Sequence, residues 1–245
     1  MYIALLCIIV VYHMVMSVID SNDTKKYFSG EKKVNKIRFL KEAVLWGWIT
    51  TIIVFIFIAM SEITLHDIGF RGVSLSNTNW LNIVTFIICG MGLAILLIQT
   101  IQCLIPKNKK ALREDFDKKK KSDNIYDWAI YNLVLPETKK ERKWFFFLSL
   151  TAGICEEIIW RGTIIFLLSA VFPALNFMGA AIISCILFGL MHSYQGIYGI
   201  IKTGIISVLF VLLYYVTDSI IPGMLVHFLF DYSSVVLAGD ENKYT

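Results

Sequence analysis

Apolar residues gather in seven stretches that alternate with polar connectors. A helix needs about 20 apolar residues to cross the hydrocarbon core of a membrane. The roughly ten-residue alternation that marks a membrane β-barrel is absent. The pattern therefore predicts an all-α, polytopic transmembrane helical bundle. The stretches are residues 2–19, 39–60, 80–105, 143–172, 176–192, 197–217 and 220–238.

The first and fourth stretches decide how many helices this bundle has. Residues 2–19 have no basic segment before them and no small-residue cleavage site before Asp20. We therefore interpret them as a retained span and not as a signal peptide. Residues 143–172 are long for one crossing and fit either a steeply tilted helix or a broken pair. We expect seven to eight membrane helices.

A long polar connector, residues 106–142, divides the chain into three parts. Residues 1–105 hold the N-terminal transmembrane helices, and residues 143–238 form a C-terminal core. Within the connector, residues 125–135 mix aromatic, aliphatic and acidic side chains. This mixture favours an amphipathic helix that lies at the membrane interface.

The composition supports a membrane protein and excludes two other classes. Apolar residues make up 57% of the chain and charged residues 17%, against about 45–50% and 25% in soluble domains. Such hydrophobicity excludes intrinsic disorder. The five cysteines are an odd number, lie within apolar stretches and form no C-x-x-C pair. A disulfide-stapled secreted domain is therefore excluded as well.

The basic residues predict how the bundle is oriented. Residues 20–41 contain seven Lys and Arg, residues 61–79 contain one, and residues 106–143 contain twelve. Because basic connectors stay on the cytoplasmic side, we expect both of them in the cytoplasm and the N-terminus outside a cell membrane. The net charge of +4 then reflects topology and contact with bilayer lipids. It gives no reason to expect nucleic acid as a partner.

Ionisable residues inside the apolar stretches are the main indication of chemistry. The first stretch has only His13, which we interpret as a packed or interfacial residue and not a catalytic one. The C-terminal stretches hold six such residues, and each costs about 2.5–3.5 kcal/mol at mid-bilayer. Together they would cost about 10 kcal/mol or more if unpaired, so we expect them to meet in the bundle interior. They are Glu156, Glu157, Arg161, His192, His227 and Asp231.

Helical spacing supports this convergence. Glu157 and Arg161 are four residues apart and share a helix face, as do His227 and Asp231. Glu156 lies about 100° round the helix from Glu157. We therefore expect one glutamate to pair with Arg161 and the other to face a cavity.

These residue types fit two kinds of chemistry. A glutamate and a histidine can hold and deprotonate a water molecule. A second histidine with a carboxylate can coordinate a divalent metal such as zinc or stabilise an oxyanion. If a metal is bound, its candidate ligands are Glu156, His192, His227 and Asp231. No H-E-x-x-H or G-x-S-x-G motif occurs.

The alternative is that the six residues only join the helices to one another through hydrogen bonds and ion pairs. An ion pair between Glu157 and Arg161 fits that role as well as a catalytic one. Joining helices does not require two histidines and three carboxylates, however, so we favour a chemical role for the group as a whole.

Three short motifs occur in order along residues 136–238. They are Glu156-Glu157-x-x-x-Arg161, Phe188-x-x-x-His192 and His227-x-x-x-Asp231. This set resembles the CPBP family of intramembrane proteases, the CAAX-protease and bacteriocin-processing group. The resemblance implies an intramembrane endopeptidase that cleaves a membrane-associated peptide or protein with an activated water.

The resemblance also implies roles for the motif residues. Glu156 would be the general base, with His192 as its partner in binding water. His227 and Asp231 would stabilise the oxyanion or assist a metal. Members of the family also carry Asn at the last position, and the Asp231 of this chain makes a metal-ligand or histidine-orienting role more attractive there.

The remaining pair, Glu157 and Arg161, would hold the site in shape.

Two other functions stay open. One is a non-catalytic membrane scaffold or bacteriocin-immunity protein of the same fold, which would tolerate the loss of Glu156. The other is an ion or proton carrier, since buried ionisable residues also suit relays.

Overall fold

The computed structural model describes residues 1–28, 35–74 and 134–234, together with positions 83, 84, 87, 90–92, 94 and 98. Within these residues the secondary structure is helical and contains no strand, which confirms the all-α prediction for this part of the chain. Most of the third apolar stretch and nearly all of the expected interfacial helix at 125–135 lie outside the described residues.

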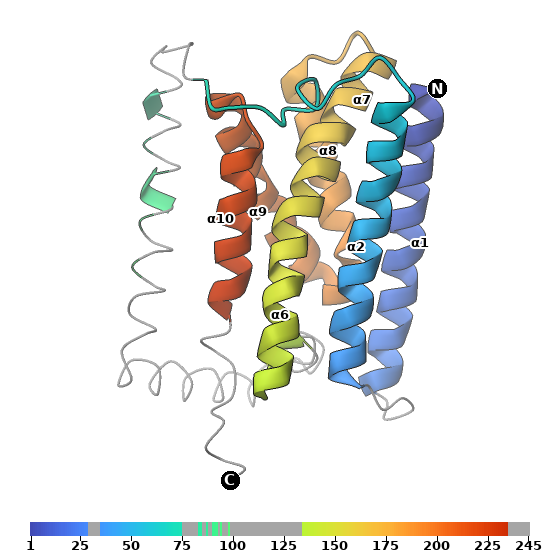
Figure 1. The fold of residues 1–245 in the computed structure, drawn as a ribbon, viewed down its shortest axis with the longest axis vertical. Helices are drawn as coiled ribbons and strands as arrows, with labels where there is room; N and C mark the ends of the chain where they lie inside the picture. Colours follow the sequence, from blue (N-terminus) through green and yellow to red (C-terminus); the bar gives the residue numbers. More distant parts are fainter. Residues whose placement is uncertain are drawn as a thin grey trace.

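The first two helices run in opposite directions at one side of the bundle (Figure 1). Helix α1 spans Tyr2–Phe28 and helix α2 spans Lys36–Ala59. The side chain of Asn35 starts α2 by accepting a hydrogen bond from the backbone N–H of Arg38 at 3.1 Å. An unsatisfied N–H in the first helical turn is thereby paired.

The fourth apolar stretch forms one continuous helical path and not a broken pair. It consists of α6 (Lys139–Thr151), a π-helix η1 (Ala152–Ile164) and α7 (Ile165–Val171). Thr138 and Glu141 start it with a capping box, in which each side chain pairs with the other residue's backbone N–H. The helical path therefore begins four residues before the apolar stretch that predicted it.

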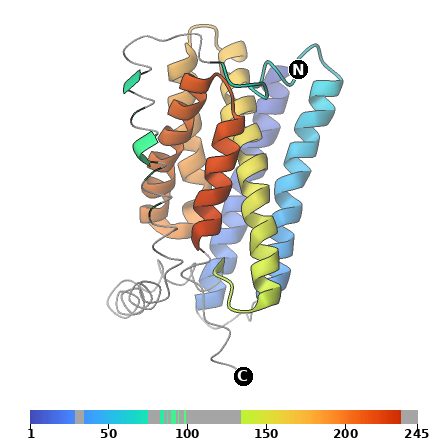
Figure 2. The same ribbon diagram turned by 60° about the vertical axis from the view of Figure 1, so that its left-hand side comes forward.

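The C-terminal helices complete the bundle. Helix α8 (Phe177–Met191) leads through the short 3₁₀ turn η2 (Ser193–Gln195) into α9 (Gly196–Thr217), and α10 (Ile221–Ser233) follows. Figure 2 shows α10 beside α6, with α8 and α9 on the far side of it. The long path through η1 therefore has neighbours on several sides.

Residues 61–74, which we call the strap, cross one end of the bundle (Figure 1). Ile68 is almost completely buried. Its carbonyl oxygen would lie 2.5 Å from a Cβ atom added to Gly162, so the strap packs directly on η1. Arg71 anchors the strap by donating from Nε to the carbonyl of Asp218 at 2.7 Å. The strap therefore covers this end of the bundle.

Basic side chains gather at the opposite end. Lys36 at the start of α2 donates to the carbonyl of Leu135 at 2.9 Å, and its Nζ lies 3.3 Å from a carboxylate oxygen of Glu137. These contacts place the beginnings of α2 and α6 together. The basic residues at the end of α1, Lys25 and Lys26, lie at the same end of the bundle.

Three helical segments of the described chain are long and apolar enough to cross a membrane: Tyr2–Lys26, Lys36–Ala59 and Ser193–Thr217. Their outward faces carry apolar side chains that are at least half exposed, such as Ile52, Ile56 and Ile205. These helices support a membrane protein. Helices α8 and α10, with 15 and 13 residues, fall short of a crossing of about 20. The expected seven to eight membrane helices are therefore shown only in part.

Candidate functional site

A buried ion pair lies at the centre of the C-terminal helices. Of the two adjacent glutamates, Glu157 is the one that pairs with Arg161, with 3.1 Å between Oε1 and Nη1. The two side chains are 1% and 0% exposed. Nη2 of Arg161 also donates to the hydroxyl of Ser207 in α9 at 3.0 Å. The arginine therefore ties η1 to α9.

Two aromatic rings enclose the guanidinium group of Arg161. Its Cζ atom lies 4.4 Å from the ring centre of Phe188 and 5.0 Å from that of Phe210. A planar, weakly hydrated cation is suited to this position, because ring faces are negative and attract it. Phe188, from the second motif, thus contributes to the burial of a charge that the first motif supplies.

His227 connects the ion pair to the two remaining acidic residues. Its Nδ1 donates to Oε1 of Glu157 at 2.8 Å, and its ring stacks on Phe210 with 4.8 Å between centres. The other ring nitrogen, Nε2, consequently points away from Glu157. It lies 3.8 Å from Oε2 of Glu156 and 3.6 Å from Oδ2 of Asp231.

Glu156 and Asp231 differ from Glu157 in their access to solvent. Their side chains are 31% and 34% exposed, whereas Glu157 is buried. Both distances to Nε2 of His227 exceed hydrogen-bonding range. Two partly exposed carboxylates thus flank one oriented imidazole nitrogen.

Glycines allow η1 and α10 to approach closely at this point. A Cβ atom on Gly223 would lie 3.1 Å from Oε2 of Glu157. One on Gly153 would lie 2.7 Å from the carbonyl oxygen of Met224 and 2.9 Å from the nitrogen of Phe228. Small residues commonly permit such contacts between membrane helices. The ion pair and His227 are brought together by this close packing.

The segment that carries Glu156, Glu157 and Arg161 is a π-helix. Its hydrogen bonds run from residue i to i+5, so its turns are wider than those of an α-helix. π-Helical turns are rare and are often found at functional sites. The local geometry therefore agrees with the interpretation of this segment as part of a site.

His192 lies at the end of α8, where the chain turns into η2. Its Nδ1 donates to the carbonyl of Phe188 at 2.8 Å, and the two rings lie 4.5 Å apart. In a neutral imidazole with the proton on Nδ1, Nε2 is left as a hydrogen-bond acceptor. Direct contacts link the other five predicted residues, and His192 joins them through the ring of Phe188.

Sequence reasoning missed three residues of this site. Ser207 holds the guanidinium group, Phe210 contacts both Arg161 and His227, and Gly223 leaves room for Glu157. A hydroxyl residue within the apolar stretch 197–217 was the available signal for Ser207. Phe210 is one of 17 Phe in the chain, and nothing in the sequence distinguished it from the others.

The sequence suggests zinc as a candidate cofactor of this site. The donor types, histidine nitrogen and carboxylate oxygen, suit zinc. Among the residues that the structure describes, however, no three His, Cys, Asp or Glu side chains are grouped so as to hold a metal ion. We therefore assign no ligand set and derive no chemical step through a metal.

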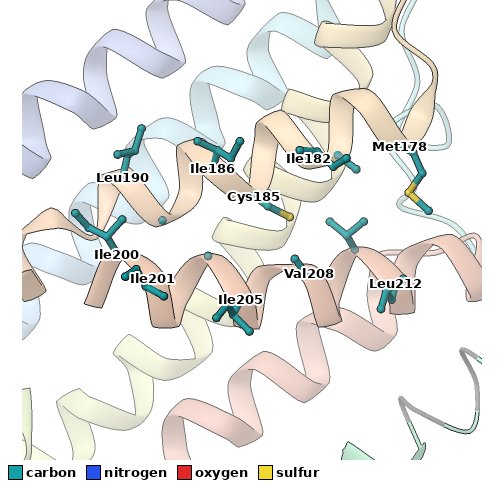
Figure 3. A pocket seen from close by; sticks show the side chains of 14 residues that line it. Met178, Ile182, Cys185, Ile186, Leu190, Ile200, Ile201, Ile205, Val208 and Leu212 are labelled. Carbon is teal, nitrogen blue, oxygen red and sulfur yellow. The ribbon is translucent and has the colours of Figure 1, made fainter. Parts of the chain in front are cut away.

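An apolar groove runs between α8 and α9, with a volume of about 400 Å³ (Figure 3). Its walls carry side chains such as Ile186 and Ile205, and Cys185 lies at its floor. None of the six predicted site residues lines it. The groove is thus distinct from the polar site.

The fold and the site together define a class: a membrane helical bundle that buries ion-paired glutamate, arginine and histidine in its interior. Residues 139–233 match a family model described as type II CAAX prenyl endopeptidase, Rce1-like. This match confirms the resemblance that the three motifs indicated. It begins at the first residue of α6, ends at the last residue of α10 and includes all six predicted site residues.

The matched family is a family of proteases. No curated protein and no solved structure matches the chain.

Proposed function

We propose that this protein is an intramembrane endopeptidase that hydrolyses a peptide bond of a membrane-associated peptide or protein. The family match supports the proposal. The observation that carries it is the buried network of Glu157, Arg161 and His227, which directs Nε2 of His227 toward Glu156 and Asp231.

Glu156 is the proposed general base. Its side chain is partly exposed, whereas Glu157 is fully engaged with Arg161 and His227. The carboxylate lies 3.8 Å from Nε2 of His227, so an oxygen atom bound at Glu156 can lie beside that nitrogen. A water molecule there would lose a proton to Glu156 as it attacks the peptide carbonyl, and Glu156 would pass that proton to the leaving amine.

His192 is the proposed partner of Glu156 in holding the water. Its Nδ1 proton is committed to the carbonyl of Phe188, so the neutral ring accepts hydrogen bonds at Nε2. An acceptor at that position can orient the second proton of the water away from the attacking lone pair. His192 would thus fix the direction of attack without taking the proton.

His227 is the proposed donor to the developing oxyanion. The carboxylate of Glu157 accepts its Nδ1 proton and stabilises the doubly protonated ring, whose Nε2–H can then donate. The carboxylate of Asp231, at 3.6 Å from Nε2, attracts the protonated ring and so helps to keep it in orientation. Arg161 offsets the charge of Glu157 and holds the helices in register.

The first experiment compares the membrane peptides of cells that contain the wild-type protein with those of cells that contain Glu156→Ala. We expect an uncleaved peptide to accumulate in the variant, with processing lowered by about 10²- to 10⁴-fold, as for loss of a general base. Mass spectrometry of membrane extracts measures this, and immunoblotting verifies equal protein abundance.

The exposed glutamate of the strap, Glu62, provides the matched control, and Glu62→Ala should process normally. If Glu156→Ala retains full processing, the endopeptidase assignment is wrong. A non-catalytic scaffold or immunity protein would then be favoured, because such a protein tolerates the loss of Glu156.

Asp231 offers a test of how the oxyanion is stabilised. If orientation of His227 by hydrogen bonding is what matters, Asp231→Asn should keep most of the processing activity and Asp231→Ala should lose it. Equal loss in both variants would instead assign the role to the negative charge. Metal analysis of the purified protein, before and after dialysis against a chelator, tests the zinc prediction separately.

We also propose that the N-terminus lies outside and that both basic connectors face the cytoplasm. The clustering of Lys25, Lys26 and Lys36 with the start of α6, opposite the strap, supports this orientation. In a Cys7→Ser background, an impermeant maleimide should label Glu62→Cys in intact cells. It should label Lys140→Cys only after permeabilisation, and the reverse pattern would invert the topology.

A further inference from the structure

Helix α1 lies outside residues 139–233, yet it contacts the turn that holds His192. The hydroxyl of Ser17 lies 2.7 Å from the hydroxyl of Ser193, a hydrogen bond between residues 176 positions apart. Ser17 is 5% exposed. A serine in the middle of a membrane helix often bonds a carbonyl of its own helix, and Ser17 instead reaches another element.

The turn after α8 places His192 at a bend in the chain. His192 is the last residue before the 3₁₀ turn Ser193–Gln195, and Gly196 follows with a φ of 75°. His192 therefore lies at a change of helical direction and not within a continuous α-helix. Its ring donates to the carbonyl of Phe188, and its own carbonyl accepts from the backbone N–H of Gln195 at 2.9 Å; neither bond ties the turn to α1.

A second contact from α1 reaches His192 through a series of aromatic side chains. The ring of His13, held by a hydrogen bond to the carbonyl of Ile9 at 2.9 Å, lies edge-on to Trp160 at 5.2 Å. Trp160 packs on Phe188 at 5.8 Å, and Phe188 packs on His192. Thus α1 supports the surroundings of His192 through an aromatic contact as well as through Ser17.

We propose that Ser17 is a positioning residue for His192: its hydrogen bond to Ser193 fixes the turn that presents Nε2 of His192 to the water. This inference rests on the proposed endopeptidase function, and it extends the catalytic unit to the N-terminal helix. Ser17 touches neither water nor substrate in this account, and it acts through the backbone next to His192.

The first test is geometric and needs no substrate. Two hydroxyl oxygens 2.7 Å apart show that the two side chains point toward each other, as cysteines at the same positions would have to do to form a disulfide. In membranes treated with copper phenanthroline, we expect Ser17→Cys/Ser193→Cys to cross-link, and the single variants to remain uncross-linked. If the double variant does not cross-link, α1 does not hold this turn and the inference is wrong.

The second test measures the position of His192 itself. Diethyl pyrocarbonate modifies accessible imidazole nitrogens, and mass spectrometry measures the rate at His192. We expect Ser17→Ala to change that rate several-fold and Ser17→Thr to restore it. Thr51→Val, which removes a hydroxyl that bonds its own helix at Gly47, is the matched control and should leave the rate unchanged.

The third test uses the peptide whose processing depends on Glu156. Ser17→Ala should lower kcat by roughly tenfold, of the order seen when a residue supporting a catalytic group is removed, with little change in KM. Ser17→Thr should recover most of it. Unchanged kcat in Ser17→Ala, with Glu156→Ala inactive, overturns the positioning role alone. Full activity of Glu156→Ala overturns the proposed function, whatever Ser17 does.

Discussion

The N-terminal pair of helices and the C-terminal helices bury different kinds of polar group. In α1 and α2 the buried polar residues of the described chain are hydroxyl side chains, such as Thr51, which donates to the carbonyl of Gly47 in its own helix. The C-terminal helices bury Glu157, Arg161 and His227, each of which needs a partner. Hydroxyls can be satisfied locally, whereas charges fix how helices assemble.

The largest effect on stability is expected at Arg161. Arg161→Ala would leave Glu157 buried without its cation and would empty the space between Phe188 and Phe210. We expect a loss of about 3–5 kcal/mol in the free energy of unfolding, as for one partner of a buried ion pair. Denaturant unfolding of the purified protein in detergent measures it.

Arg38 provides the matched control, because its ion pair with Glu42 is exposed. Arg38→Ala should cost about 1 kcal/mol or less. If the two arginine variants lose the same stability, the buried charges do not hold the C-terminal helices together, and the contrast between the two regions fails.

A smaller effect is expected where η1 and α10 make their closest approach. Gly153→Ala places a Cβ atom against the backbone of α10 at Met224 and Phe228, and backbone cannot move aside as a side chain can. We expect a loss of about 1–3 kcal/mol, measured in the same unfolding assay. Gly72→Ala, which meets nothing within 4 Å, should not share this loss. Equal stability of both variants would show that the helices can separate at little cost.

The smallest effect is expected at Thr51 in α2. Thr51→Val removes a hydroxyl that donates to the carbonyl of Gly47 in its own helix and preserves the branched shape. We expect a change of about 1 kcal/mol or less in the free energy of unfolding. A loss as large as that of Arg161→Ala would mean that the N-terminal helices also depend on a polar network.

Much of the fold could be predicted from the apolar stretches, because helix length and hydrophobicity are local properties. They predicted the cores of α1, α2, α8 and α9 to within a few residues, apart from the polar end of α1. The family resemblance was predicted from three motifs and is confirmed. The pairing of Glu157 with Arg161 followed from a spacing of four residues.

What could not be predicted depends on three-dimensional packing. The spacing of four residues favours Glu157 as the partner of Arg161, but the contacts that His227 and Gly223 make with Glu157 come from another helix and could not be predicted from it. The π-helix η1 has wider turns than an α-helix, so a sequence pattern based on 3.6 residues per turn does not reveal it. Phe210 matters because it lies between Arg161 and His227, a relation that spans three helices.

The strap described above has a consequence for how such a site can exist in a membrane. Ile63 and Ile68 fill one end of the bundle with apolar side chains, and Ile68 packs on η1 one residue beyond Arg161. The carbonyl of Ile68 occupies the space beside Gly162, so water cannot enter next to η1 at that residue. If Glu156 and Asp231 took water from one side of the membrane only, hydrolysis would not join the two aqueous compartments, and the electrochemical gradient across the bilayer would be preserved.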